Sequence, residues 1–136
     1  MALVLSDLKP GLKGNTDILV GTRDTAPHIG SGKIKVLATP VLVMMMEEAA
    51  LNAVEGLLPA GHQTVGTRLD VGHTAATPVG MRVTATAELV KVDGRKLTFQ
   101  VTARDEKETI GSGTHERIVV NVARFDQRTQ EKAARD

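Results

Sequence analysis

The stretch Thr39–Val54, TPVLVMMMEEAALNAV, decides the fold. Thr39 can cap a helix, Pro40 suits its first helical position, and a Pro-Ala-Gly sequence follows a few residues after the stretch ends. Its run VLVMMM is uninterrupted by any polar residue. A helix that is apolar nearly all round must be covered on nearly every side. The stretch therefore predicts one long central helix, from Pro40 to about Leu58.

Two neighbouring glutamates in this helix have different surroundings. The residues three, four and seven positions from Glu47 share its helix face and are all apolar. They are Pro40, Val43, Met44, Ala50, Leu51 and Val54. Glu48 instead continues a polar stripe through Asn52 and Glu55. We expect Glu47 to point into the apolar face, where a carboxylate usually serves chemistry or a specific polar contact. The alternative is that Glu47 lies at the edge of that face.

Around the helix the hydrophobic pattern changes to a period of two, which predicts strands. Five strands are expected, over residues 17–20, 64–73, 81–90, 97–103 and 110–122. Gly14, with Pro10 and Gly11 before it, is expected to prevent an earlier start of the first strand. In the second strand, alternation places Val65, Thr67 and His73 on the inward face. An Asp-Gly pair between the third and fourth strands indicates a tight hairpin.

The order of one strand, one apolar helix and four strands favours an antiparallel sheet wrapped around the helix. This is a hot-dog arrangement of the α+β class. We expect a single domain over residues 1–123 and a polar tail over residues 124–136, either a frayed helix or a disordered end. A small sheet around one helix leaves sheet edges exposed and the helix incompletely covered, so the arrangement predicts pairing of two subunits into a homodimer, or a dimer of dimers.

Composition excludes several classes of function. The chain of 136 residues has a net charge of +1 and no cysteine, tryptophan or tyrosine. A net charge near zero gives no reason to expect a nucleic acid or membrane partner. The spacing of the histidines matches no zinc motif. We expect a cytoplasmic protein that needs no metal or redox cofactor, without a transmembrane segment or a signal peptide.

Two polar residues stand at positions suited to chemistry. His73 ends a strand on its inward face, next to a loop. Thr39 stands beside the free N–H groups of the helix start, where a developing oxyanion would be stabilised. Each has a plainer alternative, because an inward histidine is often a satisfied core residue and Thr39 can be only a cap. The remaining histidines, His28, His62 and His115, are weaker candidates.

Several segments together resemble a known family, the hot-dog thioesterases of the fluoroacetyl-coenzyme A type. The resemblance runs from about residue 36 to the tail, and its longest motifs, HTAATPVG and IGSGTHER, are specific. The matching segments are Val36-Leu37-Ala38-Thr39, Glu47, Val65-Gly66-Thr67, His73–Gly80, Asp93-Gly94-Arg95 and Ile110–Arg117.

This resemblance implies a dimeric hot-dog enzyme that hydrolyses acyl-CoA thioesters. It implies a catalytic set of Thr39, Glu47 and His73. It also implies that Gly66 lies beside the thioester carbonyl and that Arg117 contributes to substrate binding.

One segment departs from the family. The fluoroacetyl-specific type carries phenylalanines before the helix, which form a lid over the acyl group. The corresponding residues here, Asp24–Lys35, contain no aromatic side chain. The three methionines before Glu47 are adaptable, which favours a more permissive acyl pocket.

Two other functions fit the same fold. A non-catalytic acyl-CoA binding or sensing module would keep the pocket without turnover, although a pure binder has no need of a buried base. An enoyl-CoA hydratase would need an Asp and a His on a characteristic segment, which this sequence lacks. The prediction is therefore a thioesterase that acts on a small or medium acyl-CoA.

Overall fold

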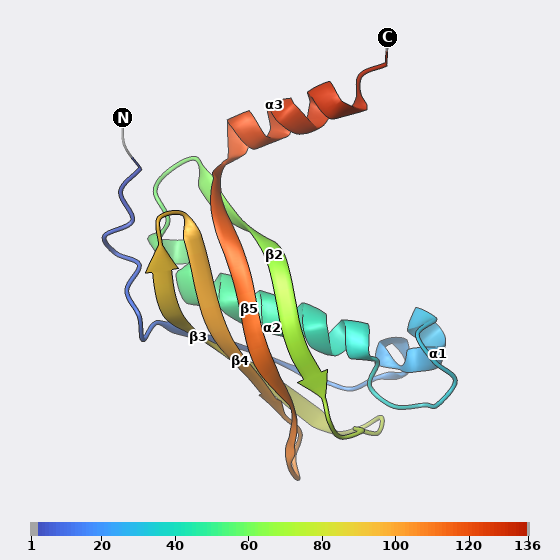
Figure 1. Cartoon of the computed structure of the whole chain (residues 1–136). Coiled ribbons are helices and arrows are strands. Elements are labelled where there is room, and N and C mark those ends of the chain that lie inside the picture. The colour runs from blue at the N-terminus through green and yellow to red at the C-terminus, as the bar shows by residue number, and fades with distance from the viewer. Residues whose placement is uncertain (1–2, 136) are drawn as a thin grey trace.

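The computed structural model describes residues 3–135 and shows a five-stranded antiparallel sheet curled around one long helix (Figure 1). The strands are β1 (Lys13–Leu19), β2 (His62–His73), β3 (Arg82–Asp93), β4 (Lys96–Arg104) and β5 (Thr109–Asn121), in the spatial order β1-β3-β4-β5-β2. The helices are α1 (Ala26–Ile29), α2 (Thr39–Val54) and α3 (Val122–Ala133), with single 3₁₀ turns at Thr22–Asp24 and Glu55–Leu57. The predicted α+β arrangement of a sheet around one helix is confirmed.

The middle strands follow the predicted alternation. Residues 83, 85, 87 and 89 of β3 and residues 97, 99, 101 and 103 of β4 are all buried and face α2. The predicted tight hairpin joins the two strands, and Gly94 takes a φ of 60° there, a conformation that glycine adopts without strain. The apolar face of these two strands packs against the helix.

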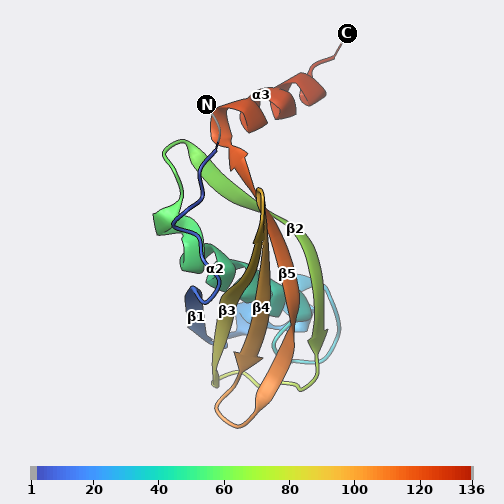
Figure 2. The ribbon, with the colours of Figure 1, turned by 60° about the vertical axis from the view of Figure 1, so that its left-hand side comes forward.

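Helix α2 packs mainly against β1 and β3, at one side of the sheet (Figure 2). At Gly14 of β1, an added Cβ would stand 2.2 Å from the carbonyl oxygen of Ala49. Gly14 therefore allows the helix and the strand to approach, and it lies within β1. Our prediction that the first strand begins near residue 17 was wrong, because glycine is required here for packing.

The opposite side of α2, toward β2, is incompletely covered within one chain. Met44 is 53% exposed and Val43 is only partly buried. This agrees with the expectation that one small sheet leaves the helix incompletely covered within a single chain. Strands β1 and β2 form the two free edges of the sheet, and β2 borders the uncovered side of the helix (Figure 2).

A bulge in β2 changes which side chains face the helix. The pairing of β2 with β5 shifts register between Gly66 and Arg68. Thr64 is consequently buried and Thr67 is exposed, so the predicted inward positions of Val65 and Thr67 were wrong. Without the bulge, positions 66 and 73 would face opposite sides of the sheet, because they are an odd number of residues apart. The extra residue turns both toward α2.

The chain ends in helix α3, which projects from the end of β5 away from the sheet (Figure 1). The side chain of Asn121 caps it by accepting a hydrogen bond from the backbone N–H of Arg124 at 3.1 Å. Among residues 3–135, no helix combines the length and the apolar character needed to cross a membrane.

Candidate active site

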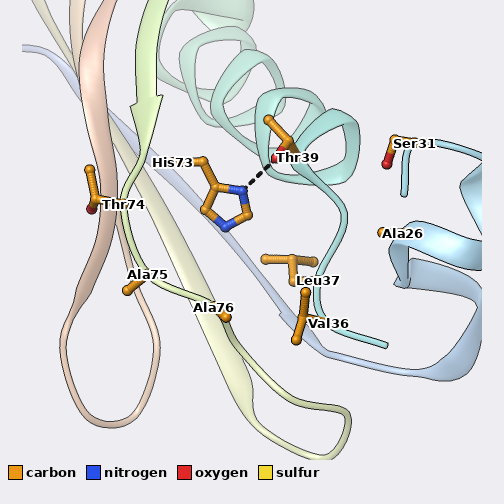
Figure 3. Close-up of a pocket in the computed structure, with 9 residues that line it drawn as sticks. All are labelled: Ala26, Ser31, Val36, Leu37, Thr39, His73, Thr74, Ala75 and Ala76. Carbon is orange, nitrogen blue, oxygen red and sulfur yellow. Dashed lines mark hydrogen bonds between the residues drawn. The ribbon is translucent and has the colours of Figure 1, made fainter. Parts of the chain in front are cut away.

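The side chains of Thr39 and His73 are joined by a hydrogen bond between Thr39 Oγ1 and His73 Nδ1, 2.7 Å long (Figure 3). Thr39 is the first residue of α2, and His73 is the last residue of β2. Ala38 occupies the cap position, and no side chain caps this helix end. The prediction that Thr39 caps the helix was wrong, because its hydroxyl is directed to the imidazole instead.

A pocket of about 300 Å³ opens beside this pair. It is lined by small and aliphatic side chains in addition to Thr39 and His73, namely Ala26, Ser31, Val36, Leu37, Thr74, Ala75 and Ala76 (Figure 3). None of these residues is aromatic. Both members of the Thr39–His73 pair line the pocket. Its size suits a short acyl group or the thioester end of a larger substrate.

The second imidazole nitrogen of His73, Nε2, is buried and has no hydrogen-bond partner among the described residues. An unpaired buried polar atom costs about 1–3 kcal/mol and is characteristic of functional sites. Burial lowers the pKa of His73, although the nearby backbone of Ala75, which favours the charged imidazolium, opposes the shift. His73 is therefore neutral at pH 7 and has one nitrogen free for proton transfer.

Glu47 lies at the border of the uncovered side of α2, and its side chain is 40% exposed. The prediction that it points into the apolar face was wrong for the single chain, because Met44 and Leu51 beside it are themselves incompletely buried. Its carboxylate oxygen Oε2 lies 3.7 Å from Nη1 of Arg117. Glu48 is exposed, as predicted, and accepts a hydrogen bond from the Thr16 hydroxyl at 2.7 Å.

Arg117, on the inward face of β5, is a buried cation held by several hydrogen bonds. Its Nε donates to Thr64 Oγ1 at 2.8 Å, and its Nη2 donates to the Thr64 carbonyl at 3.1 Å. Its Nη1 lies 3.2 Å from Nε2 of His115, which is fully buried. Burial lowers the pKa of Arg117 while Glu47 raises it, and the guanidinium remains charged.

Sequence reasoning underestimated His115 and Thr64. The sequence carried one signal for His115, because two polar residues, His115 and Arg117, recur with period two on an otherwise apolar strand face. No local signal pointed to Thr64, because the bulge in β2 reverses its side of the sheet.

Gly66 faces this cluster, and a side chain at this position would press on the Glu47 carboxylate. An added Cβ would stand 2.8 Å from Glu47 Oε2 and 3.4 Å from Nη1 of Arg117. Any other residue would displace the carboxylate or the strand. The structure thus brings together three of the predicted site residues, Glu47, Gly66 and Arg117.

The predicted catalytic set is divided between two places. Thr39 and His73 form one pair, and Glu47 lies with Gly66 and Arg117. Thr39 and Glu47 are eight positions apart, which corresponds to about 12 Å along a helix axis. Within residues 3–135, no hydrogen bond or ion pair joins the two groups. One offers a hydroxyl and a neutral imidazole, and the other offers a carboxylate beside a fixed cation.

Comparison with known proteins identifies close relatives of this chain. Residues 20–123 match a family model described as fluoroacetyl-CoA-specific thioesterase. The fluoroacetyl-CoA thioesterase of Streptantibioticus cattleyicolor is 45% identical over 98 residues, which cover 72% of this chain and 70% of the relative.

Solved structures show the same fold. A fluoroacetyl-CoA thioesterase variant in complex with fluoroacetate is 37% identical, has a TM-score of 0.86, and aligns over 92% of this chain and 98% of its own. A thioesterase superfamily member from Thermus thermophilus is 26% identical, has a TM-score of 0.83, and aligns over 91% of this chain and 94% of its own.

Proposed function

This chain belongs to the fluoroacetyl-CoA-specific thioesterase family and is an acyl-CoA thioesterase, and we propose that Thr39, Glu47 and His73 hydrolyse the thioester of a small or medium acyl-CoA. The observation that supports this most is the 2.7 Å hydrogen bond between Thr39 and His73, in a pocket where Nε2 of His73 has no partner among residues 3–135. The test is release of free thiol from a panel of acyl-CoAs. A hydratase would instead remove enoyl absorbance, and a binding module would be stabilised by CoA esters without turnover.

In the proposed reaction, Glu47 supplies the oxygen nucleophile or activates it. In one route its carboxylate attacks the thioester carbonyl, the C–S bond breaks, and water then hydrolyses the resulting anhydride. In the other route it removes a proton from water as the water attacks. In the first route the thiolate departs, and neutral His73 takes a proton from the water that attacks the anhydride and passes it to the thiolate. In the second route the proton that Glu47 takes from water passes to His73 and then to the thiolate. Thr39 orients the imidazole. The backbone N–H of Gly66 or of the first turn of α2 stabilises the oxyanion, and Arg117 binds at the acyl end.

A second copy of the chain would bring the two halves of the site together. Strand β2 has a free edge, and the adjoining face of α2 exposes Met44. Antiparallel pairing of two β2 edges about a two-fold axis sets opposite ends of the strands side by side. The Glu47 of one protomer would then approach the partner's His73. We therefore propose a homodimer whose active site takes residues from both protomers.

This assembly predicts a sedimentation mass of about twice the 14.5 kDa of one chain, or a multiple of that, at micromolar concentration. It also predicts complementation between inactive variants. Equal amounts of Glu47→Gln and His73→Gln chains, unfolded and refolded together, should recover about a quarter of wild-type activity, because half the dimers contain one intact site. Each variant refolded alone is the control. A monomer would contradict the dimer, and a dimer without recovery would place the complete set within one chain.

The pocket predicts weak discrimination among short acyl groups. Its lining and the segment before α2 contain no aromatic side chain. An apolar pocket usually distinguishes one small substituent by only about 1–3 kcal/mol, and that requires close packing around it. We expect acetyl-, fluoroacetyl- and somewhat longer acyl-CoAs to differ in kcat/KM by less than about a hundredfold. Measured side by side, a fluoroacetyl preference of several thousandfold would show that aliphatic groups close this pocket tightly.

A further inference from the structure

His115 is a fully buried histidine whose two ring nitrogens both have partners. Nδ1 lies 2.8 Å from the carbonyl oxygen of Arg68, which can only accept, so Nδ1 carries the proton. Nε2 lies 3.2 Å from Nη1 of Arg117, which can only donate, so Nε2 is the acceptor. The ring also stacks on Phe99, with centroids 6.1 Å apart. Its surroundings therefore define one neutral tautomer.

The hydrogen bond to His115 uses one of the two hydrogens on Nη1 of Arg117. Thr64 holds the opposite side of the guanidinium, through Nε and Nη2. The group is thus fixed on two sides, and Nη1 remains 3.7 Å from the Glu47 carboxylate. Arginine and carboxylate groups that are free to move usually close to about 2.7–2.9 Å.

We propose that His115 is a positioning residue that keeps Arg117 beside Glu47 without letting the two groups close into a full hydrogen-bonded pair. This inference rests on the proposed role of Glu47. The cation stabilises the charge of the carboxylate, while the oxygen lone pairs stay available for attack on the thioester or on a water proton. Among the described residues His115 has no hydrogen bond to Glu47, so it acts on the carboxylate through Arg117.

Loss of the acceptor has a defined consequence. The Nη1 hydrogen that now points to His115 would be left unpaired in the core, which is costly. It would gain a partner if the guanidinium shifted toward Glu47 Oε2, which lies 3.7 Å from Nη1. The carboxylate would then be held in a tight hydrogen bond and would react more slowly. Burial is the largest influence on the pKa of His115 and lowers it, and the Arg117 charge acts in the same direction. The Arg68 carbonyl and the carboxylates of Glu47 and Glu116 oppose the shift, but the net direction is downward and favours the neutral ring with Nε2 as acceptor.

Two substitutions of His115 distinguish the roles of its two ring nitrogens. In His115→Gln, the side-chain carbonyl reaches roughly the position of Nε2 and can still accept from Arg117. In His115→Asn, the shorter amide reaches roughly the position of Nδ1 and cannot. We expect His115→Asn to lower kcat about tenfold with KM changed less than about threefold, and His115→Gln to stay within about threefold of wild type in both.

Three further measurements distinguish positioning from a structural role. Far-UV circular dichroism should give similar melting temperatures for the two variants, and it suits a chain without Trp or Tyr. In a Glu47→Gln background, His115→Asn should have no further effect on residual turnover, because its effect passes through the carboxylate. ¹⁵N NMR of the wild-type protein should show His115 neutral and protonated on Nδ1 at pH 7, whether or not the variants fold.

The outcomes separate this inference from the proposed function. If Glu47→Gln is inactive but His115→Asn turns over like wild type, the inference is wrong and the proposed function stands. Equal losses in the Asn and Gln variants that follow their melting temperatures would also overturn it, as would a charged or Nε2-protonated imidazole by NMR. If Glu47→Gln itself retains full turnover, the proposed role of Glu47 fails first.

Discussion

Glu47→Gln is expected to lower kcat by about 10²-fold or more, the range typical of losing a catalytic acid–base group. Glutamine keeps the size of the side chain but removes the charge that faces Arg117 at 3.7 Å. It can neither attack the thioester nor take a proton from water. Turnover of a short acyl-CoA, measured by thiol release, tests this directly.

Glu48→Gln is the matched control, on the same helix and one residue away. Its carboxylate is exposed and accepts a hydrogen bond from Thr16 on β1, far from Arg117. We expect a change of less than about threefold in kcat. Because Arg117 is buried, Glu47→Gln leaves a cation without its counter-charge, and melting temperatures of both variants should be recorded. A larger loss in Glu48→Gln than in Glu47→Gln would contradict the assigned roles.

His73→Gln is expected to lower kcat/KM by about 10²–10³-fold, because the proton-transfer group in the pocket is lost while a polar side chain near Thr39 is kept. His62→Gln is the control. His62 begins the same strand, and its Nδ1 contacts only the carbonyl of Ala60, at 3.0 Å. Its replacement should leave activity within about threefold of wild type. A comparable loss at both positions would indicate damage to β2 instead of loss of chemistry at His73.

The pH dependence gives a second test of His73. Burial lowers its pKa, so the imidazole stays neutral to a lower pH than the ordinary value of about 6.5. If the neutral form accepts the proton, kcat/KM should be constant above the lowered pKa and should fall as pH drops through it. The acid limb is therefore expected below pH 6.5 or so, and it should be absent from the residual activity of His73→Gln. A limb centred above that value would contradict a buried, neutral His73.

The sequence predicted correctly wherever one local rule acts alone. In β3 and β4, strict alternation of apolar residues and an Asp-Gly turn leave one arrangement that buries the apolar face. The start of the helix was also readable, because Pro40 suits a first turn. Its end was expected at about Leu58, which is too late, since the α-helix ends at Val54 and a 3₁₀ turn follows it. The three residues proposed as catalytic were named from the helix pattern, from a strand end and from the family resemblance.

The predictions failed where a contact between segments far apart in the sequence outweighs a local preference. Thr39 looks like a helix cap, but His73 approaches from a strand 34 positions later and takes its hydroxyl. Gly14 looks like a strand breaker, but the close passage of α2 requires it inside β1. In both cases the local preference is worth about 1 kcal/mol, which a tertiary contact easily exceeds.

By itself the sequence determined a sheet wrapped around one apolar helix, because period-two and helical patterns of burial depend only on the order of residues along the chain. Only the tertiary structure decided the phase of β2. A single extra residue at its bulge turns both Gly66 and His73 toward α2 and buries Thr64 under Arg117. A bulge has no strong local sequence signature, because it forms where contacts with the partner strand and the helix stabilise the shifted register. The position of each site residue therefore depends on contacts between segments that the sequence keeps far apart.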